Sequence, residues 1–214
     1  MQKALESVTK YSNKIRELPV VRRVTVKYPL LCRDDVAKKL ASVGEMLPEG
    51  LYLQVDSAYR TRKTQEILWK IRNKIMGDLV HNPINGIPPH CTGGAVDISL
   101  VDQYGKEINL SKPFKKFYME PQLISNKITA ESQGLRLELN KLMLENGFAP
   151  YPTEYWHFSY GDSVWAEYYH AKEIYGEISL PKDQYYPFII RLYYKILKRI
   201  WRLVIKYLKI DTNY

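Results

Sequence analysis

Cysteine is scarce in this sequence. Only Cys32 and Cys91 occur among 214 residues, which is too few for the disulfide framework of a small secreted protein. The first twenty residues contain no apolar segment of the kind that directs secretion. From these two absences we expect a cytoplasmic protein whose thiols are reduced.

Outside one segment, the sequence also lacks a strong excess of charge. The formal net charge is +9, but residues 185–214 contain seven Lys or Arg and one acid, so this segment carries +6 and the rest of the chain +3. A charge of +3 spread over the remaining residues is no electrostatic signature of nucleic-acid binding. We therefore expect no nucleic-acid partner.

A regular alternation of strands and helices is absent as well. Apolar residues alternate with polar ones in two expected strands, and they recur every three or four positions in three expected helices. The expected strands are 51–55 and 95–101, and the expected helices are 34–47, 64–77 and 131–146. This order favours an α+β fold with a small antiparallel sheet flanked by helices. Residues before about Val24 have weak helical periodicity, and we expect them to pack on this core.

What the sequence does contain is a short stretch with the residue types that bind metal ions. His90 and Asp97 lie on either side of Gly93 and Gly94, and two adjacent glycines allow the backbone to turn tightly. The strand expected to follow would hold Asp97 rigidly. An imidazole and a carboxylate placed in this way form a candidate pair of metal ligands.

A third ligand must come from another part of the chain. Glu154 precedes His157 by three positions in an aromatic-rich run about sixty residues further on. Two histidines, one aspartate and a free glutamate nearby are typical of a hydrolytic zinc site. The alternative for any lone histidine is a structural role, and we assign that role to His81 and His170.

Five segments that occur in order resemble one family of enzymes. They are LPEGLYLQVDSAYR, HCTGGAVDISLVDQYG, LMLENGF, EYWHFSYGD and WAEYYHAKEIYG, within about residues 30–177. In these segments the chain resembles the VanX-type D-alanyl-D-alanine dipeptidases, zinc metallopeptidases of the superfamily that includes the VanY-type D,D-carboxypeptidases. The resemblance implies a D,D-peptidase/Hedgehog-like fold, with the catalytic domain in residues 1–182.

The resemblance also implies a role for each residue of the site. It makes His90, Asp97 and His157 the ligands of one zinc ion per chain. It makes Glu154 the catalytic base and Arg60 the electrophilic helper that stabilises the oxyanion. The implied reaction is hydrolysis of the D-alanyl-D-alanine dipeptide to free D-alanine.

Substrate recognition departs from the family pattern at two positions. Pro88 stands where members have Ser, and Lys115 stands where they have the Asp that helps to receive the free ammonium of the dipeptide. A lysine there would repel an ammonium by about 1–4 kcal/mol at a separation of about 4 Å, unless another acid such as Glu120 serves instead. Tyr59 and Trp156 are the other expected substrate contacts, although aromatic residues also suit a core or a pocket wall.

Three kinds of function remain open on these residues. The first is a zinc D,D-dipeptidase, and the second is a zinc D,D-carboxypeptidase or amidase acting on N-acylated or larger peptidoglycan-derived peptides. The third is a non-catalytic zinc-binding relative, against which the presence of the whole predicted site argues. Lys115 separates the first two, because it suits a substrate with an acylated amino end better than a free dipeptide.

Residues 183–214 lie beyond the resemblance and have a different character. In an expected helix over 185–210, basic residues recur every three or four positions and form one stripe, while apolar residues cover the other faces. No uncharged run approaches the roughly 20 residues that a membrane span needs. We expect peripheral contact with an anionic membrane, or else packing against the catalytic domain or a second copy in a homo-oligomer.

Overall fold

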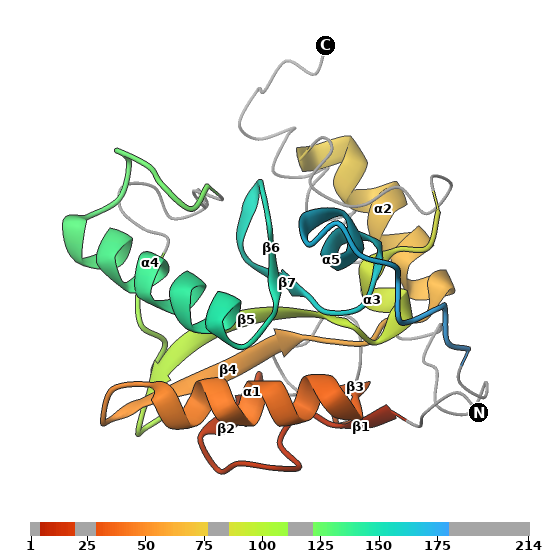
Figure 1. The fold of residues 1–214 in the computed structure, drawn as a ribbon. Coiled ribbons are helices and arrows are strands. Elements are labelled where there is room, and N and C mark those ends of the chain that lie inside the picture. Colours follow the sequence, from red (N-terminus) through yellow and green to blue (C-terminus); the bar gives the residue numbers. More distant parts are fainter. Residues whose placement is uncertain (1–4, 20–28, 77–85, 111–121, 180–214) are drawn as a thin grey trace, which may run out of the picture.

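The computed structural model describes residues 5–19, 29–76, 86–110 and 122–179 (Figure 1). Its strands are β1 (Leu5–Ser7), β2 (Ile15–Glu17), β3 (Leu31–Arg33), β4 (Leu51–Ser57), β5 (Ala95–Asp102), β6 (Ala149–Tyr151) and β7 (Glu154–Ser159). Its helices are α1 (Asp34–Met46), α2 (Arg62–Met76), α3 (Pro89–Thr92), α4 (Ala130–Glu145) and α5 (Ser163–Tyr168). Within these ranges, no helix has the length and apolar character that crossing a membrane requires.

One mixed sheet organises this part of the chain. Its strand order is β2-β4-β5-β7-β6, and neighbouring strands are antiparallel except for the parallel pair of β2 and β4. β1 and β3 form a separate two-stranded antiparallel sheet. In Figure 1, α4 lies toward one end of the sheet, and α2, α3 and α5 gather toward the other. The expected α+β fold is confirmed.

One face of the sheet forms the hydrophobic core with α1 and α4. Leu53, Ile98 and Phe158 contribute from three neighbouring strands, and each is at most 1% exposed. Leu40 of α1 and Leu139 of α4 belong to the same buried cluster. Burial of such side chains, each worth about 1.5–3 kcal/mol, anchors both helices on this face.

The opposite face of the sheet is polar. Because successive side chains of a strand alternate between faces, Asp97 and Ser99 of β5 point away from the core side chain of Ile98. Gln54 pairs with Ser99, and His157 pairs with Asp97, and residues directly opposite in an antiparallel pair share a face. The polar face therefore brings together residues from three strands, including two residues of the predicted site.

A single helical turn, α3, carries His90 to the start of β5. It ends at Gly93, whose φ of 75° is a left-handed conformation that favours glycine. Gly94 has no room for a side chain, because a Cβ there would overlap the carbonyl oxygen of Tyr160. The amide of Tyr160 also donates to the Gly94 carbonyl at 3.1 Å. The two glycines thus close the predicted turn and let the chain after β7 pack directly against it.

The predicted elements agree with the structure in kind. Strands 51–55 and 95–101 are parts of β4 and β5, and helices 34–47, 64–77 and 131–146 correspond to α1, α2 and α4. The helical interpretation of the chain before Val24 is wrong where the structure describes it, because β1 and β2 are strands. Pairing with β3 and β4 overrides the weak local preference there. The predicted C-terminal helix in 183–214 lies outside the described residues.

Two glycines provide a matched test of this packing. Gly94→Ala should lower the free energy of unfolding by about 1–3 kcal/mol, because the new methyl group overlaps a carbonyl oxygen. Gly134→Ala, in the interior of α4 with no heavy atom within 4 Å of the added Cβ, should raise it by about 0.5–1 kcal/mol. Urea unfolding of both variants measures the difference, and equal effects of the two would contradict the packing described at Gly94.

Candidate metal centre

Three donor atoms converge at the end of β5. The Oδ1 atom of Asp97 lies 3.3 Å from Nε2 of His90 and 3.0 Å from Nδ1 of His157. One ligand atom from each of these residues lies within 4.8 Å of the other two. Both imidazoles are buried, at 4% and 6% exposure, and their rings meet edge to face. The structure therefore brings the three predicted ligands into a cluster that can hold one metal ion.

The outer nitrogen of each histidine has its own contact. Nδ1 of His90 lies 2.8 Å from the carbonyl oxygen of Ala58, so it carries the proton and leaves Nε2 free to bind a metal. Nε2 of His157 lies 3.4 Å from Oγ of Ser159, which is fully buried. Contacts of this kind orient metal-binding imidazoles. The donor set and its surroundings thus fit a metal ion.

Electrostatics within the cluster favour a neutral His90 and an ionised Asp97. Burial lowers the pKa of His90 to about 4, and the charge of Arg60 adds to this effect. Burial also opposes protonation of His157, but its hydrogen bond to Asp97 and the charge of that carboxylate raise the pKa overall. Burial alone would raise the pKa of Asp97, yet the imidazoles and Arg60 hold it well below its usual value. A metal ion must displace the proton of His157, so affinity should fall as the pH falls.

Arg60 contacts Asp97 on the side that faces away from the two histidines. Its Nη2 donates to Oδ2 of Asp97, the oxygen that does not face the histidines. Its Nε donates to Oγ of Ser57 at 2.9 Å, and its Nη1 donates to Oε1 of Gln65 at 3.4 Å. Ser57 ends β4 and Gln65 lies in the first turns of α2, so two elements hold the guanidinium in place. The structure places Arg60 beside the predicted site and gives it a contact with a predicted ligand.

Glu154 lies next to the cluster but is not part of it. Glu154 is 9% exposed, and its Oε2 is 3.9 Å from Nδ1 of His157. This separation is too long for a hydrogen bond. The position suits a base that acts on water and not on the metal, a role that stays a prediction.

The predicted substrate contacts have different surroundings. Tyr59 is 5% exposed and donates its hydroxyl to the carbonyl of Ile178 at 2.7 Å, so this hydroxyl takes part in a contact within the protein. Trp156 is half-buried, with its ring edge to face with that of Tyr155 at 5.0 Å. Lys115 lies outside the described residues. The substrate roles of these three residues stay predictions.

Some neighbours of the cluster carry no signal in the sequence pattern. The ring of Tyr151, at the end of β6, meets His157 edge to face at 5.3 Å between centroids. Arg60 is held by Ser57 and Gln65, and His90 is held by the carbonyl of Ala58. Their spacing from Arg60 and His90 follows from tertiary packing, and only a resemblance extended residue by residue could have pointed to them.

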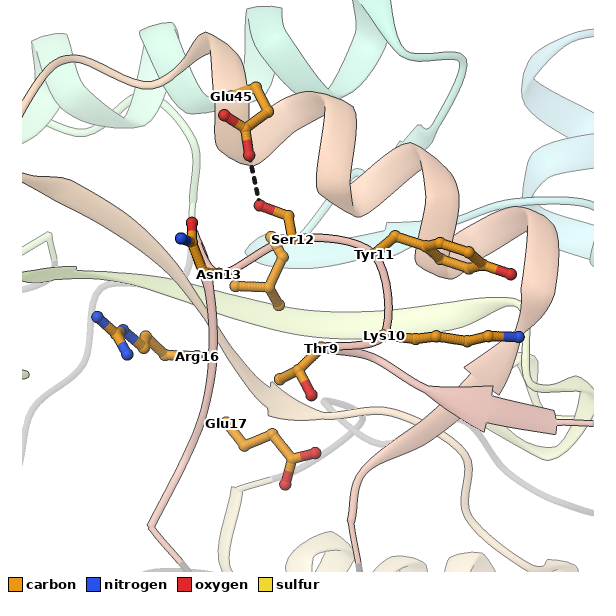
Figure 2. Close-up of a pocket in the computed structure, with 9 residues that line it drawn as sticks. Thr9, Lys10, Tyr11, Ser12, Asn13, Arg16, Glu17 and Glu45 are labelled. Carbon is orange, nitrogen blue, oxygen red and sulfur yellow. Dashed lines mark hydrogen bonds between the residues drawn. The ribbon is translucent and has the colours of Figure 1, made fainter.

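A surface hollow of about 790 Å³ lies on the loop that joins β1 and β2 (Figure 2). Its lining includes none of the predicted site residues. Its polar groups are engaged within the protein: Ser12 donates to Glu45 of α1 at 2.5 Å, and Glu17 accepts from the amide of Leu30 at 3.1 Å. The hollow thus marks where this loop is tied to α1, and we assign it no ligand.

Comparisons with known proteins agree with this geometry. The sequence profile of the peptidase M15 family, described as D-ala-D-ala dipeptidase, matches residues 24–174. A D-alanyl-D-alanine dipeptidase of Synechocystis sp. is 32% identical over 116 residues, which make up 49% of this chain and 44% of that protein. The match thus spans less than half the length of this relative. Both findings confirm the resemblance that the five sequence segments indicate.

Removal of a donor should remove the metal. We expect His90→Ala and His157→Ala to lose stoichiometric metal, because two donors no longer hold the ion against dialysis. His170→Asn is a matched control, since His170 is exposed with φ of 50° and asparagine tolerates that conformation. Metal content after dialysis decides the outcome, and full stoichiometry in the two alanine variants would refute the assignment.

Proposed function

The chain belongs to the peptidase M15 family of D-ala-D-ala dipeptidases, and on this premise we propose that it hydrolyses D-alanyl-D-alanine to free D-alanine with one zinc ion. The observation that carries the proposal is the convergence of His90, Asp97 and His157 within 4.8 Å. The neighbouring carboxyl and guanidinium groups supply the remaining chemistry of a peptidase.

Zinc is the ion that this donor set suits best. Two imidazole nitrogens and one carboxylate oxygen are ligands that zinc prefers, whereas magnesium and calcium favour sites made of oxygen atoms. Catalytic zinc sites combine three protein ligands with one open position. When bound, zinc supplies a water molecule of lowered pKa and polarises the scissile carbonyl.

Glu154 is the proposed general base. Its Oε2 lies 3.9 Å from Nδ1 of His157, beside the donor cluster. From this position the carboxylate accepts a proton from the attacking water and later delivers it to the leaving amino group. The nearly complete burial of Glu154 limits exchange of that proton with bulk water.

Arg60 is the proposed partner of the oxyanion. A guanidinium has five N–H groups, and three of them engage Ser57, Gln65 and Asp97. The remaining N–H groups can stabilise the negative charge that develops on the carbonyl oxygen. Because Arg60 is held by two elements, it needs little reorganisation to act.

A second substrate class follows from residue 115. A lysine near the amino end of the substrate would favour an N-acylated or larger peptidoglycan-derived peptide over the free dipeptide, by the repulsion between two cations. The second candidate function is therefore a zinc D,D-carboxypeptidase or amidase that uses the same metal site and the same base.

Glu154→Gln should retain zinc and lose hydrolysis. We expect kcat to fall at least about 100-fold, because the amide cannot accept the proton of water. Arg60→Ala should lower kcat at saturating zinc by about 100-fold or more, through loss of oxyanion stabilisation. Release of D-alanine and zinc content, measured on the same preparations, separate the two roles.

Glu173→Gln provides the control, since Glu173 is exposed and the variant should keep both zinc and activity. If Glu154→Gln loses its zinc, Glu154 is a ligand and not the base. If Arg60→Ala keeps full turnover, Arg60 serves only to hold Asp97.

The charge of residue 115 can be tested with its neighbour as a control. Lys115→Asp should improve kcat/KM for D-alanyl-D-alanine relative to its N-acetyl form by about tenfold or more, because repulsion of the ammonium becomes attraction. Lys116→Asp makes the same change of charge one residue away and should have a smaller effect. An unchanged ratio in Lys115→Asp would mean that this side chain does not face the amino end.

A further inference from the structure

A β-bulge in β4 brings two successive residues, Asp56 and Ser57, onto the polar face of the sheet. In the pairing of β4 with β5, Val55 stands opposite Ile98 and Ser57 stands opposite Asp97, so Asp56 is an extra residue between them. Bulges of this kind re-aim side chains and are frequent next to active sites. Regular alternation would place Asp56 and Ser57 on opposite faces, whereas the contacts of both side chains lie on the face that carries Asp97.

Asp56 is held on that face through one of its two oxygens. Its Oδ1 accepts from Nε2 of Gln54 at 2.8 Å and from Oγ of Ser99 at 3.1 Å. Gln54 and Ser99 are themselves buried and joined by a hydrogen bond of 3.0 Å. The carboxyl is thus fixed by a buried network, and within the described residues Oδ2 has no hydrogen bond of its own.

The charge of this carboxyl is poorly compensated. No Lys or Arg nitrogen of the described residues lies within ion-pair distance of Asp56, while Asp97 and Glu107 both add negative potential. Burial, the largest effect, raises the pKa of Asp56 to about 7, against the hydrogen bonds from Ser99 and Gln54 that lower it. A half-buried carboxylate in such surroundings gains stability from any cation that reaches it.

Asp56 also lies close to the proposed reaction centre. Side chains two residues apart on a strand are separated by roughly 7 Å, so Ser99, and the Asp56 carboxyl bonded to it, lie about one side-chain row from Asp97. β5 and β7 are antiparallel. The residues that precede His157, including Glu154, therefore lie in the direction that leads from Asp97 to Ser99. In a dipeptide with a free amino end, the ammonium nitrogen is two bonds from the scissile carbonyl carbon. A substrate whose carbonyl lies at the metal site can therefore place its ammonium near the Asp56 carboxyl.

We propose that Asp56 receives the ammonium of a substrate with a free amino end and thereby makes the site selective for such substrates over N-acylated ones. The inference rests on the proposed peptidase function and names a specificity-determining residue for it. Gln54 and Ser99 act as positioning residues, because they hold one oxygen of the carboxylate and leave the other to face the substrate.

A cycle that changes both the protein and the substrate tests the contact. Zinc-loaded wild-type protein and Asp56→Asn are compared on D-alanyl-D-alanine and on its N-acetyl form, with kcat and KM measured for each. We expect Asp56→Asn to raise KM for the free dipeptide about tenfold or more and to change KM for the acetylated form by less than about twofold. Ser99→Ala, which keeps the carboxylate but removes one hydrogen bond, should shift the same ratio in the same direction by a smaller factor.

Glu107→Gln is the control for a general change in potential. It removes an exposed charge whose effect on the pKa of Asp56 is the smallest of those named above, and it should change the ratio of the two KM values much less than Asp56→Asn does. Equal changes on both substrates, or no change, in Asp56→Asn would overturn the inference while leaving the peptidase intact. Should Asp56→Asn not fold, an unaltered ratio in Ser99→Ala overturns it.

Failure of the proposed function gives a different result. If wild-type protein hydrolyses neither substrate, calorimetric titration of D-alanyl-D-alanine into the zinc-loaded wild type and Asp56→Asn still tests the contact. About tenfold weaker binding by the variant supports the inference, and equal affinity, or no binding by either protein, overturns it.

Discussion

The rest of the site depends on the contacts that the carboxylate of Asp97 makes. One oxygen lies within 3.3 Å of nitrogen atoms of both buried histidines, and the other accepts a hydrogen bond from Arg60. A buried carboxylate is tolerated only where charges and hydrogen bonds compensate it. Here α3, β7 and the loop after β4 each supply one partner, so the arrangement of these elements and the ionisation of Asp97 support one another.

Sheet register turns a long separation in sequence into this contact. Asp97 and His157 are direct partners in the pairing of β5 with β7, and their neighbours Val96, Ile98 and Phe158 belong to the hydrophobic core. A slip by one residue would bury Asp97 among apolar side chains and turn Ile98 to the polar face. The core therefore fixes the positions of Asp97 and His157, two of the proposed metal ligands, although it contributes no atom to the site.

The polar face carries a cost that function can explain. Gln54, Ser99 and Asp56 form a hydrogen-bonded network on central strands, and such networks are less stable than apolar packing unless every group is satisfied. The bulge in β4 adds a local irregularity at the same place. Both features are accounted for together if the network holds a carboxylate for the substrate, beside the proposed metal site.

The amino-acid pattern alone predicts the kind of elements present and the chemistry that they carry. Alternation in 51–55 and 95–101 and helical spacing in 131–146 reflect which side chains must leave water, and this local pattern survives in β4, β5 and α4. The residue types of His90, Asp97 and His157 indicated a metal site, and the resemblance joined them across sixty residues. These inferences succeed because burial periodicity and ligand chemistry are properties of the side chains themselves.

The way in which the ends of these elements meet depends on contacts between segments that are distant in sequence. The strands before Val24 exist because β3 and β4 offer free edges, which no local pattern records. The hydrogen bonds of Arg60 and the burial of Tyr59 against Ile178 depend on packing between distant segments. The placement of Ser57 on the same face as Asp56 depends on a bulge. Such contacts form because the whole chain adopts the fold of lowest free energy. No short stretch of sequence determines that free energy by itself.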